Sequence, residues 1–492
     1  MRSLTMSRRA IVCSVLTALA LGAHPEIAVT RAAGDKVPIT TTSAEARDLY
    51  LKGRDLAEKL RATDARKFYE QAVAKDASFA LGHVGLANTS GTTREFIDSV
   101  TRAAALADTV SDGEKHVILG LEAAMKGNPA GQLAHYTELV KLFPNDERAH
   151  TLLGNTHFGR QDYDAAIKEY VRATTINPSF SQPYNQLGYA YRFIEKFDDA
   201  EKAFKKYVQL IPDDPNPHDS YAELLMKMGR FQESIAAYEK ALSLDANFVA
   251  SYIGIGSNYL SQGQTDKART AFARIAAVAR TTGERRLAHF WTAASYVHEG
   301  ATDKALDELR AGYKLAEAER DAGSMSGDLT QMADVLREAG RLDEASAKYD
   351  EAVTVIDKAS VPEEVKAATR RTHVFEQGRL AVARGDLATA KAKAAEYGRL
   401  IEPRKAPFEL RLQHELRGEI ALAGKQPAAA AQEFAGANQQ DPKVLYLTAL
   451  ALRDAGDNAR AMKLAAKAAK FNGLAFNYGY VRTKAAKLVN QS

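Results

Sequence analysis

Apolar residues recur every three to four positions along most of this chain, which is the spacing of one face of an α-helix. The stretch QLGYAYRFIEKFDDAEKAFKKYVQLIPDDP (186–215) shows this pattern twice, with the polar turn EKFD between two amphipathic blocks and prolines at its end. Strong helix formers recur throughout, whereas clusters of β-branched residues are scarce. The chain is therefore predicted to be all-α and built from helical hairpins.

The same residue types return every 34 positions, as Pro144, Pro178 and Pro212 show. A small residue in the first helix of each hairpin and an aromatic residue in the second keep the same phase: Gly120, Gly154, Gly188, Ala222 and Gly256, then Tyr136, Tyr170, Phe204, Tyr238 and Phe272. One hairpin buries too few side chains to offset the conformational entropy of ordering it, so such units are expected to stack in an array.

These residues resemble the tetratricopeptide repeat family. In the unit that begins at Ser181, the family's positions hold Gly188, Tyr191, Ala200, Phe204 and Pro212. The resemblance implies a right-handed superhelical solenoid of stacked antiparallel helix pairs. Weaker copies of the pattern extend it to about twelve units over residues 45–471.

The repeat pattern divides the chain into four expected parts. They are a signal peptide and short linker (1–34), an N-terminal array (35–315), a C-terminal array with longer repeats (316–471), and a capping helix and tail (472–492). The spacing of the units lengthens past residue 283, so longer helices or inserted loops are expected in the C-terminal half.

The first residues, MRSLTMSRRAIVCSVLTALALGAHPEIA, combine a basic start, an apolar run and small residues. This layout is typical of a cleaved secretory signal, because the apolar run from Ala10 to Leu21 is shorter than the roughly 20 residues that span a bilayer. Arg8 and Arg9 leave twin-arginine export open as an alternative route. We therefore expect export to the periplasm or cell envelope of a bacterium.

Cys13 is the only cysteine, so a chain cleaved after this segment contains no disulfide, thiol nucleophile or cysteine-ligated metal. The formal net charge is +4, and basic residues concentrate in residues 1–34 and 443–492. The residues between these two segments are mildly acidic overall and lack the clustered basic residues that are typical of a nucleic-acid-binding surface. Only the basic C-terminal end could contact a membrane, and docking there on anionic lipid is one alternative function.

Catalytic motifs are absent from the sequence: there is no HExxH, GxSxG, GxxxxGK[ST] or CxxC. His150 and His157 are seven residues apart on one predicted helix, but packing within the repeat explains them better than a metal does. The sequence thus predicts no catalytic residue, cofactor or metal. An enzyme with an unrecognised active site in the groove stays open as a further alternative.

The resemblance implies that a protein or peptide partner binds the concave face, which the first helices line. First-helix residues off the packing phase are the candidates: Arg148, Thr151, Asn155, Phe158, Asn185, Tyr189, Arg192, Phe193, Asp219, Glu223, Met226 and Ser257. Some family members hold a carboxylate with lysine, asparagine and arginine, and this chain departs from that pattern at Thr151, Asp219 and Glu223. The predicted function is a non-catalytic exported scaffold that acts in envelope assembly or secretion.

Overall fold

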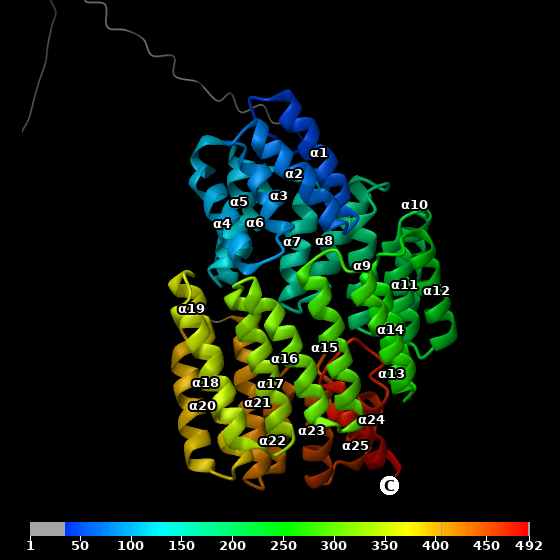
Figure 1. Cartoon of the computed structure of the whole chain (residues 1–492), viewed down its shortest axis with the longest axis vertical. Helices are drawn as coiled ribbons and strands as arrows, with labels where there is room; N and C mark the ends of the chain where they lie inside the picture. The colour runs from blue at the N-terminus through cyan, green and yellow to red at the C-terminus, as the bar shows by residue number, and fades with distance from the viewer. Residues whose placement is uncertain (1–34, 405, 491–492) are drawn as a thin grey trace, which may run out of the picture. The chain divides into compact units, whose positions relative to one another are not determined.

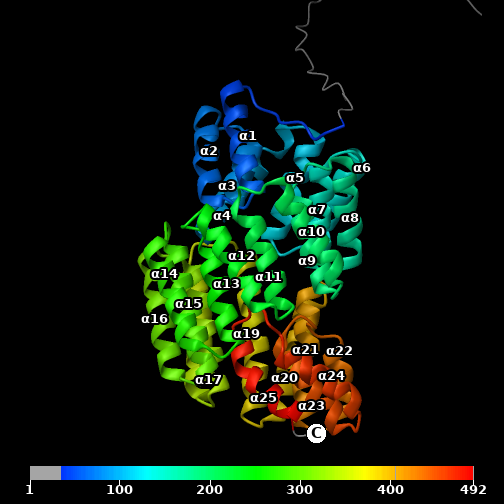
Figure 2. The same ribbon diagram turned by 90° about the vertical axis from the view of Figure 1, so that its right-hand side faces the viewer.

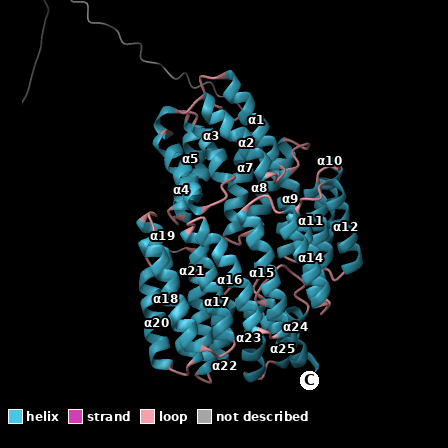
Figure 3. Cartoon of the chain, viewed as in Figure 1, coloured by secondary structure: helices cyan, strands magenta, loops and turns pink. Residues whose placement is uncertain are grey.

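A computed structural model describes residues 35–404 and 406–490, which belong to one compact unit, Asp35–Ser492 (Figure 1). The predicted signal segment, with Arg8, Arg9 and Cys13, lies outside the described residues. Figure 3 shows helices joined by loops throughout this part of the chain, with no strand. The all-α prediction is confirmed.

Twenty-four helices form twelve consecutive pairs, as the repeat predicts. The first helices of the pairs are α1 (Ala44–Glu58), α3 (Ala80–Asn88), α5 (Asp112–Met125), α7 (Glu147–Gly159), α9 (Gln182–Phe193), α11 (Pro215–Lys227), α13 (Val249–Ser261), α15 (Thr282–Glu299), α17 (Ala322–Glu338), α19 (Glu363–Ala383), α21 (Pro407–Ala423) and α23 (Pro442–Asp454). The second helices are α2 (Ala62–Lys75), α4 (Thr93–Ala105), α6 (Pro129–Leu142), α8 (Tyr163–Ile176), α10 (Phe197–Leu210), α12 (Phe231–Leu244), α14 (Thr265–Val278), α16 (Thr302–Ala318), α18 (Leu342–Lys358), α20 (Leu387–Ile401), α22 (Pro427–Ala435) and α24 (Asn458–Ala469). A short 3-10 turn, η1 (Ala107–Thr109), precedes α5, and α25 (Tyr478–Asn490) follows the last pair.

The small and aromatic residues of the repeat meet inside each hairpin. A Cβ added at Gly188 would lie 2.5 Å from the Phe204 ring, and one at Gly154 would lie 2.5 Å from the Tyr170 ring. Phe204 and Tyr170 are themselves fully buried. In these two hairpins the helices approach closely because the first helix has no side chain at the point of contact.

The hairpin turns also follow the 34-residue period. Gly127, Gln161, Glu195, Gly229 and Gly263 each have positive φ and come just after a first helix. A left-handed residue at this place ends the helix and turns the chain back. Glycine adopts that conformation freely, whereas Gln161 and Glu195 do so at a cost of roughly 1–2 kcal/mol each.

The longer units of the C-terminal half contain longer helices. Helices α7 to α14 have 12 to 14 residues, whereas α15 has 18 and α19 has 21. Stacking continues without interruption, because α16 packs on α17. The expectation of longer helices past residue 283 is confirmed.

The C-terminal half of the unit lies against the hairpin turns of the N-terminal half (Figure 2). Arg404 donates to the carbonyl of Gly127, Arg411 to that of Arg160 (3.1 Å) and Arg482 to that of Ser261 (2.8 Å). We call this series of contacted turns, at residues 127, 160–161, 193–195, 227–229 and 261–263, the turn row. The carbonyls at the end of a helix lack intrahelical partners and carry partial negative charge, so arginines stabilise them.

α25 packs against α23 and α24, and also against α15 from an earlier part of the stack. No helix among the described residues is both long enough and apolar enough to cross a membrane.

Candidate functional site

A cavity of about 490 Å³ lies among the first helices α9, α11, α13 and α15, and the turn between α1 and α2 closes one side of it. We call it the groove pocket. Its size falls within the range of ligand-binding cavities in proteins. Its lining includes Leu60, Arg61, Asp64, Tyr189, Asp219, Glu223, Asp245, Ile253, Arg280, Leu287, Trp291 and Leu474.

The base of the groove pocket is polar. Tyr189 donates a 2.9 Å hydrogen bond to Glu223, which also forms a 2.5 Å ion pair with Arg192. Asp219 accepts a 2.7 Å hydrogen bond from Ser251, yet burial raises the pKa of Asp219 to about 7. Among the described residues no cation pairs with Asp219, so the pocket contains a carboxyl group whose charge changes near neutral pH.

The mouth of the groove pocket is apolar. Leu60, Leu287 and Leu474 are three of the few large hydrophobic side chains that the described residues expose, and all three border this cavity. Ile253 and Trp291 continue the apolar surface inward. Exposed apolar side chains gathered at one cavity are typical of a surface that binds a partner.

Ion pairs hold the turn between α1 and α2 against the neighbouring helices. Arg61 lies 3.1 Å from Asp64 and 4.0 Å from Asp245, and Arg280 lies 3.9 Å from Asp64. These ion pairs join α1–α2 to the ends of α12 and α14. The pocket thus depends on residues more than 180 positions apart in the sequence.

Three of the predicted groove residues, Tyr189, Asp219 and Glu223, line the groove pocket together. Arg192 lies behind them, buried and paired with Glu223. Asn155 is exposed and borders a separate cavity of about 460 Å³, where it accepts a 2.8 Å hydrogen bond from Tyr170.

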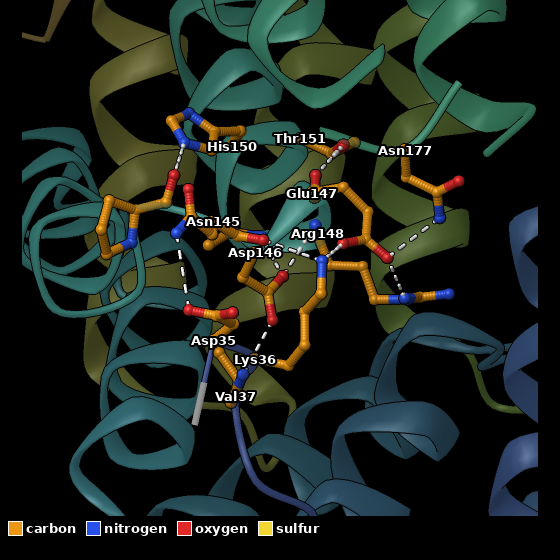
Figure 4. Close-up of polar contacts among 12 residues, drawn as sticks. Asp35, Lys36, Val37, Asn145, Asp146, Glu147, Arg148, His150, Thr151 and Asn177 are labelled. Atoms are coloured by element: carbon orange, nitrogen blue, oxygen red, sulfur yellow. Dashed lines mark hydrogen bonds and ion pairs between the residues drawn. The ribbon is translucent and has the colours of Figure 1, made fainter. Parts of the chain in front are cut away.

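Arg148 and Thr151 lie instead in a polar cluster at the start of α7 (Figure 4). Thr151 donates to the carbonyl of Glu147 (2.7 Å), and the side chains of Glu147 and Arg148 are 2.8 Å apart. Lys36 reaches the same glutamate from the N-terminal segment. Arg148 also binds both carboxylate oxygens of Glu58 on α1, at 2.6 and 3.0 Å.

The remaining predicted residues are used in packing. Asn185, Met226 and Ser257 are buried, with Met226 fully so, and they offer no surface to a partner in this conformation. Phe158 and Phe193 pack edge to face, 5.5 Å apart, and are partly buried. Part of the predicted groove surface is thus used in packing within the stack.

Three histidines join the first and second helices of their hairpins. Each places Nδ1 2.6 to 2.8 Å from a glutamate 19 residues later: His150 with Glu169, His289 with Glu308, and His414 with Glu433. Across the described ranges, no three His, Cys, Asp or Glu side chains are grouped so as to hold a metal ion.

Sequence reasoning missed a second cavity, of about 360 Å³, in the C-terminal half. Charged side chains of α17, α19, α21 and α23 line it, and Glu415 and Arg379 are nearly fully buried there. The signal was present as charged residues on one phase of successive first helices, at Glu376, Arg379 and Glu419. In the sequence, such a pattern is typical of a solvent-exposed helix face. The burial of these residues becomes apparent only in the stacked structure.

The basic C-terminal end contributes contacts within the chain. Lys443 pairs with Glu338 at 2.7 Å, Lys467 pairs with Glu195 at 2.8 Å, and Arg482 caps α13. Several basic residues of the C-terminal end thus contact other helices of the stack. Membrane docking through residues 443–492 stays a prediction.

Three family models match the chain: one described as "TPR repeat" over residues 154–192, and two described as "Tetratricopeptide repeat" over residues 181–214 and 225–289. No curated protein matches the chain.

Similar solved structures cover part of the chain. The crystal structure of MamA is 24% identical, covers 32% of this chain and 91% of its own, and has a TM-score of 0.28. YrrB, titled a TPR protein with an unusual peptide-binding site, is 17% identical over 37% of this chain and 91% of its own, with a TM-score of 0.26. PilF of Pseudomonas aeruginosa is 17% identical over 45% of this chain and 92% of its own, with a TM-score of 0.31. The matched repeats lie within a stack of twelve helix pairs, and the chain contains tetratricopeptide repeats over residues 154–214 and 225–289.

Proposed function

We propose that this protein is a non-catalytic scaffold that binds an extended segment of a protein partner in the groove pocket. The observation that carries the proposal is the convergence of Tyr189, Asp219 and Glu223 below a mouth of exposed leucines. The leucines and Trp291 suit an apolar side chain of the segment. The carboxyl groups below suit hydrogen-bond donors, from backbone amides or from a basic side chain.

The binding of peptides tests this proposal, with Trp291 as the reporter. Trp291 is the single tryptophan of the chain and borders the groove pocket. Peptides selected on the full chain from a displayed random library should change its fluorescence on binding. We expect them to share an apolar residue beside a donor or a basic residue.

Two variants locate the binding. Leu287→Asp places a charge at the mouth of the groove pocket and should weaken the selected peptides at least about tenfold, since it replaces apolar contact with a desolvated carboxylate. Val171→Asp changes an exposed side chain of α8 outside the pocket and is the matched control. Peptides that bind both variants as tightly as the unchanged chain would contradict the groove pocket as the site.

We also propose that the protein is exported to the cell envelope of a bacterium, where the scaffold serves assembly or secretion. The signal-like layout of residues 1–34 supports this. Protein recovered from the periplasm should begin between Gly22 and Asp35 by N-terminal sequencing. Replacing Arg8 and Arg9 with lysine should block export only along the twin-arginine route, and recovery of the uncleaved chain in the cytoplasm would contradict export.

A further inference from the structure

The 360 Å³ cavity of the C-terminal half, which we call the charged cavity, holds more buried negative than positive groups. The carboxylates of Asp334, Glu338, Glu376, Glu415 and Glu419 surround the cations Arg337, Arg379 and Lys443. Asp441 and Arg411 also line it and leave this difference unchanged.

Arg379 and Lys443 are already shared among these carboxylates. Arg379 lies 3.4 Å from Glu376, 3.5 Å from Glu419 and 3.7 Å from Glu415. Lys443 lies 2.7 Å from Glu338 and 3.6 Å from Glu419. Among the described residues Arg411 pairs with no carboxylate, and it donates a 3.1 Å hydrogen bond to the carbonyl of Arg160. The carboxylates around the cavity still outnumber its cations, so a bound cation would relieve the excess negative charge.

Of these five carboxylates, Glu415 has the most distant ion pair, 3.7 Å from Arg379. Only 7% of its surface is exposed, and within residues 35–404 and 406–490 no group donates a hydrogen bond to it. Burial raises the pKa of Glu415 to about 7, with Glu419 and Asp441 adding to the rise. A buried carboxylate that lacks donors strongly favours any cation that can reach it.

The rest of the cavity wall suits the remainder of such a ligand. The hydroxyl of Tyr480 is buried, has no hydrogen-bond partner in the described part of the chain, and belongs to the lining. Phe375, Phe408 and Phe476 supply aromatic surface, and Phe408 is 61% exposed. Aromatic faces attract organic cations and pack against apolar stems.

We propose that the charged cavity binds an organic cation, an ammonium or guanidinium group on an apolar stem, with Glu415 as its counter-ion. The Tyr480 hydroxyl accepts a hydrogen bond from the cation, and Phe408 covers the stem. The cation is either a free amine or guanidine, or a lysine or arginine side chain of another protein. This site is separate from the groove pocket, and either one can fail without the other.

Calorimetric titration of the full chain tests the proposal. The probes are n-butylguanidinium, n-butylammonium and, as the anionic control, n-butyrate. The two cations should bind at pH 8 and n-butyrate should not. At pH 6 the cations should bind roughly tenfold more weakly, because Glu415 is then mostly protonated.

Variants separate charge from packing. Glu415→Gln should abolish cation binding, whereas Glu402→Gln, an exposed change on the same half, should leave it unaltered. Phe408→Ala should weaken binding several-fold without changing the fold, since the side chain is mostly exposed. Thermal unfolding of each variant verifies that it is folded.

A capped peptide, acetyl-Gly-Arg-Gly-amide, distinguishes the two sources. Tighter binding of this peptide than of n-butylguanidinium identifies a partner's side chain, and binding of n-butylguanidinium alone identifies a free small molecule. Absence of binding by every cation at pH 8, equal binding of n-butyrate, or unchanged binding by Glu415→Gln would each overturn the proposal.

Discussion

Lys227 and Phe471 are 244 residues apart, yet the Lys227 ammonium lies 4.0 Å from the centre of the Phe471 ring and donates a 2.7 Å hydrogen bond to the Phe471 carbonyl. This contact joins the end of α11 to the segment after α24. It is one of the interactions along the turn row that attach the C-terminal half to the N-terminal half.

Phe471→Leu should destabilise the protein by about 1–2 kcal/mol at pH 7, because it removes the ring and keeps the hydrogen bond to the backbone. Burial lowers the pKa of Lys227 to about 8, with Arg192 and Lys467 adding to the effect. Since the neutral amine is not attracted to the ring as a cation is, the cost should shrink as the pH rises through 8. Urea unfolding at pH 7 and at about pH 9.5 measures this. Leu400→Ala, an exposed change on α20, is the control, and an equal cost at both pH values would contradict the prediction.

Gly188→Ala should destabilise the protein by about 1–3 kcal/mol, because the added Cβ would lie 2.5 Å from the Phe204 ring. Gly159→Ala is the matched control: Gly159 is the last residue of α7, and nothing lies within 4 Å of a Cβ there. That change should be neutral or stabilising. Thermal unfolding of both variants measures the difference. If both cost the same, contact with Phe204 is not the reason that glycine is needed.

Glu114→Ala should cost about 2–4 kcal/mol, because Glu114 is fully buried and fixes the segment before α1. It accepts 2.6 Å hydrogen bonds from both the backbone N–H and the hydroxyl of Thr40, and a further 2.6 Å one from the Ser111 hydroxyl. Residues 35–43 should then become sensitive to limited proteolysis before the stack unfolds. Glu138→Ala, a change on α6 whose partly exposed side chain pairs only with Lys141 among the described residues, should alter neither property. Unchanged cleavage in Glu114→Ala would show that Thr40 is held by other contacts.

Asp219→Asn should stabilise the protein above pH 7 by about 2–4 kcal/mol and have little effect near pH 4. Burial raises the folded pKa of Asp219 to about 7, well above its unfolded value. The folded state therefore holds the proton more tightly, and the stability from this group is present at low pH and lost as the pH rises through 7. Urea unfolding from pH 4.5 to pH 8 tests the sign. A gain that is the same at both ends would mean that the charge of Asp219 is not the cause.

The hairpins could be predicted because their determinants are local. Gly188 and Phe204 are sixteen residues apart, and their types alone report a close approach of two helices. The period of 34 then repeats the same unit, so one hairpin predicts its neighbours. This is why the fold followed from the sequence.

The candidate sites could be predicted only in part. Tyr189, Asp219 and Glu223 were found because the repeat frame points first-helix residues inward. Arg61 and Leu60 were not, since they reach the groove pocket only through the curvature of the whole stack. The repeat pattern also does not show which inward-facing residues of a first helix are covered by the next first helix.

Part of the inward-facing surface of the first helices is covered by neighbouring first helices. Asp219 on α11 bonds Ser251 on α13, and Met226 is covered completely. In the charged cavity, the same geometry buries Arg379 and Glu415. Whether a polar position is solvated or enclosed depends on contacts between units, which no single repeat encodes.

The turn row gives the stack an unusual mechanical property. In a superhelix whose repeats contact only their neighbours, the pitch can change when a force is applied or a partner binds. Here Arg404, Arg411 and Arg482 of the C-terminal half hydrogen-bond three turns of this row in the N-terminal half. Extending the superhelix would have to break these hydrogen bonds together. A partner must therefore bind the groove pocket at its present width, because the stack cannot lengthen to widen it.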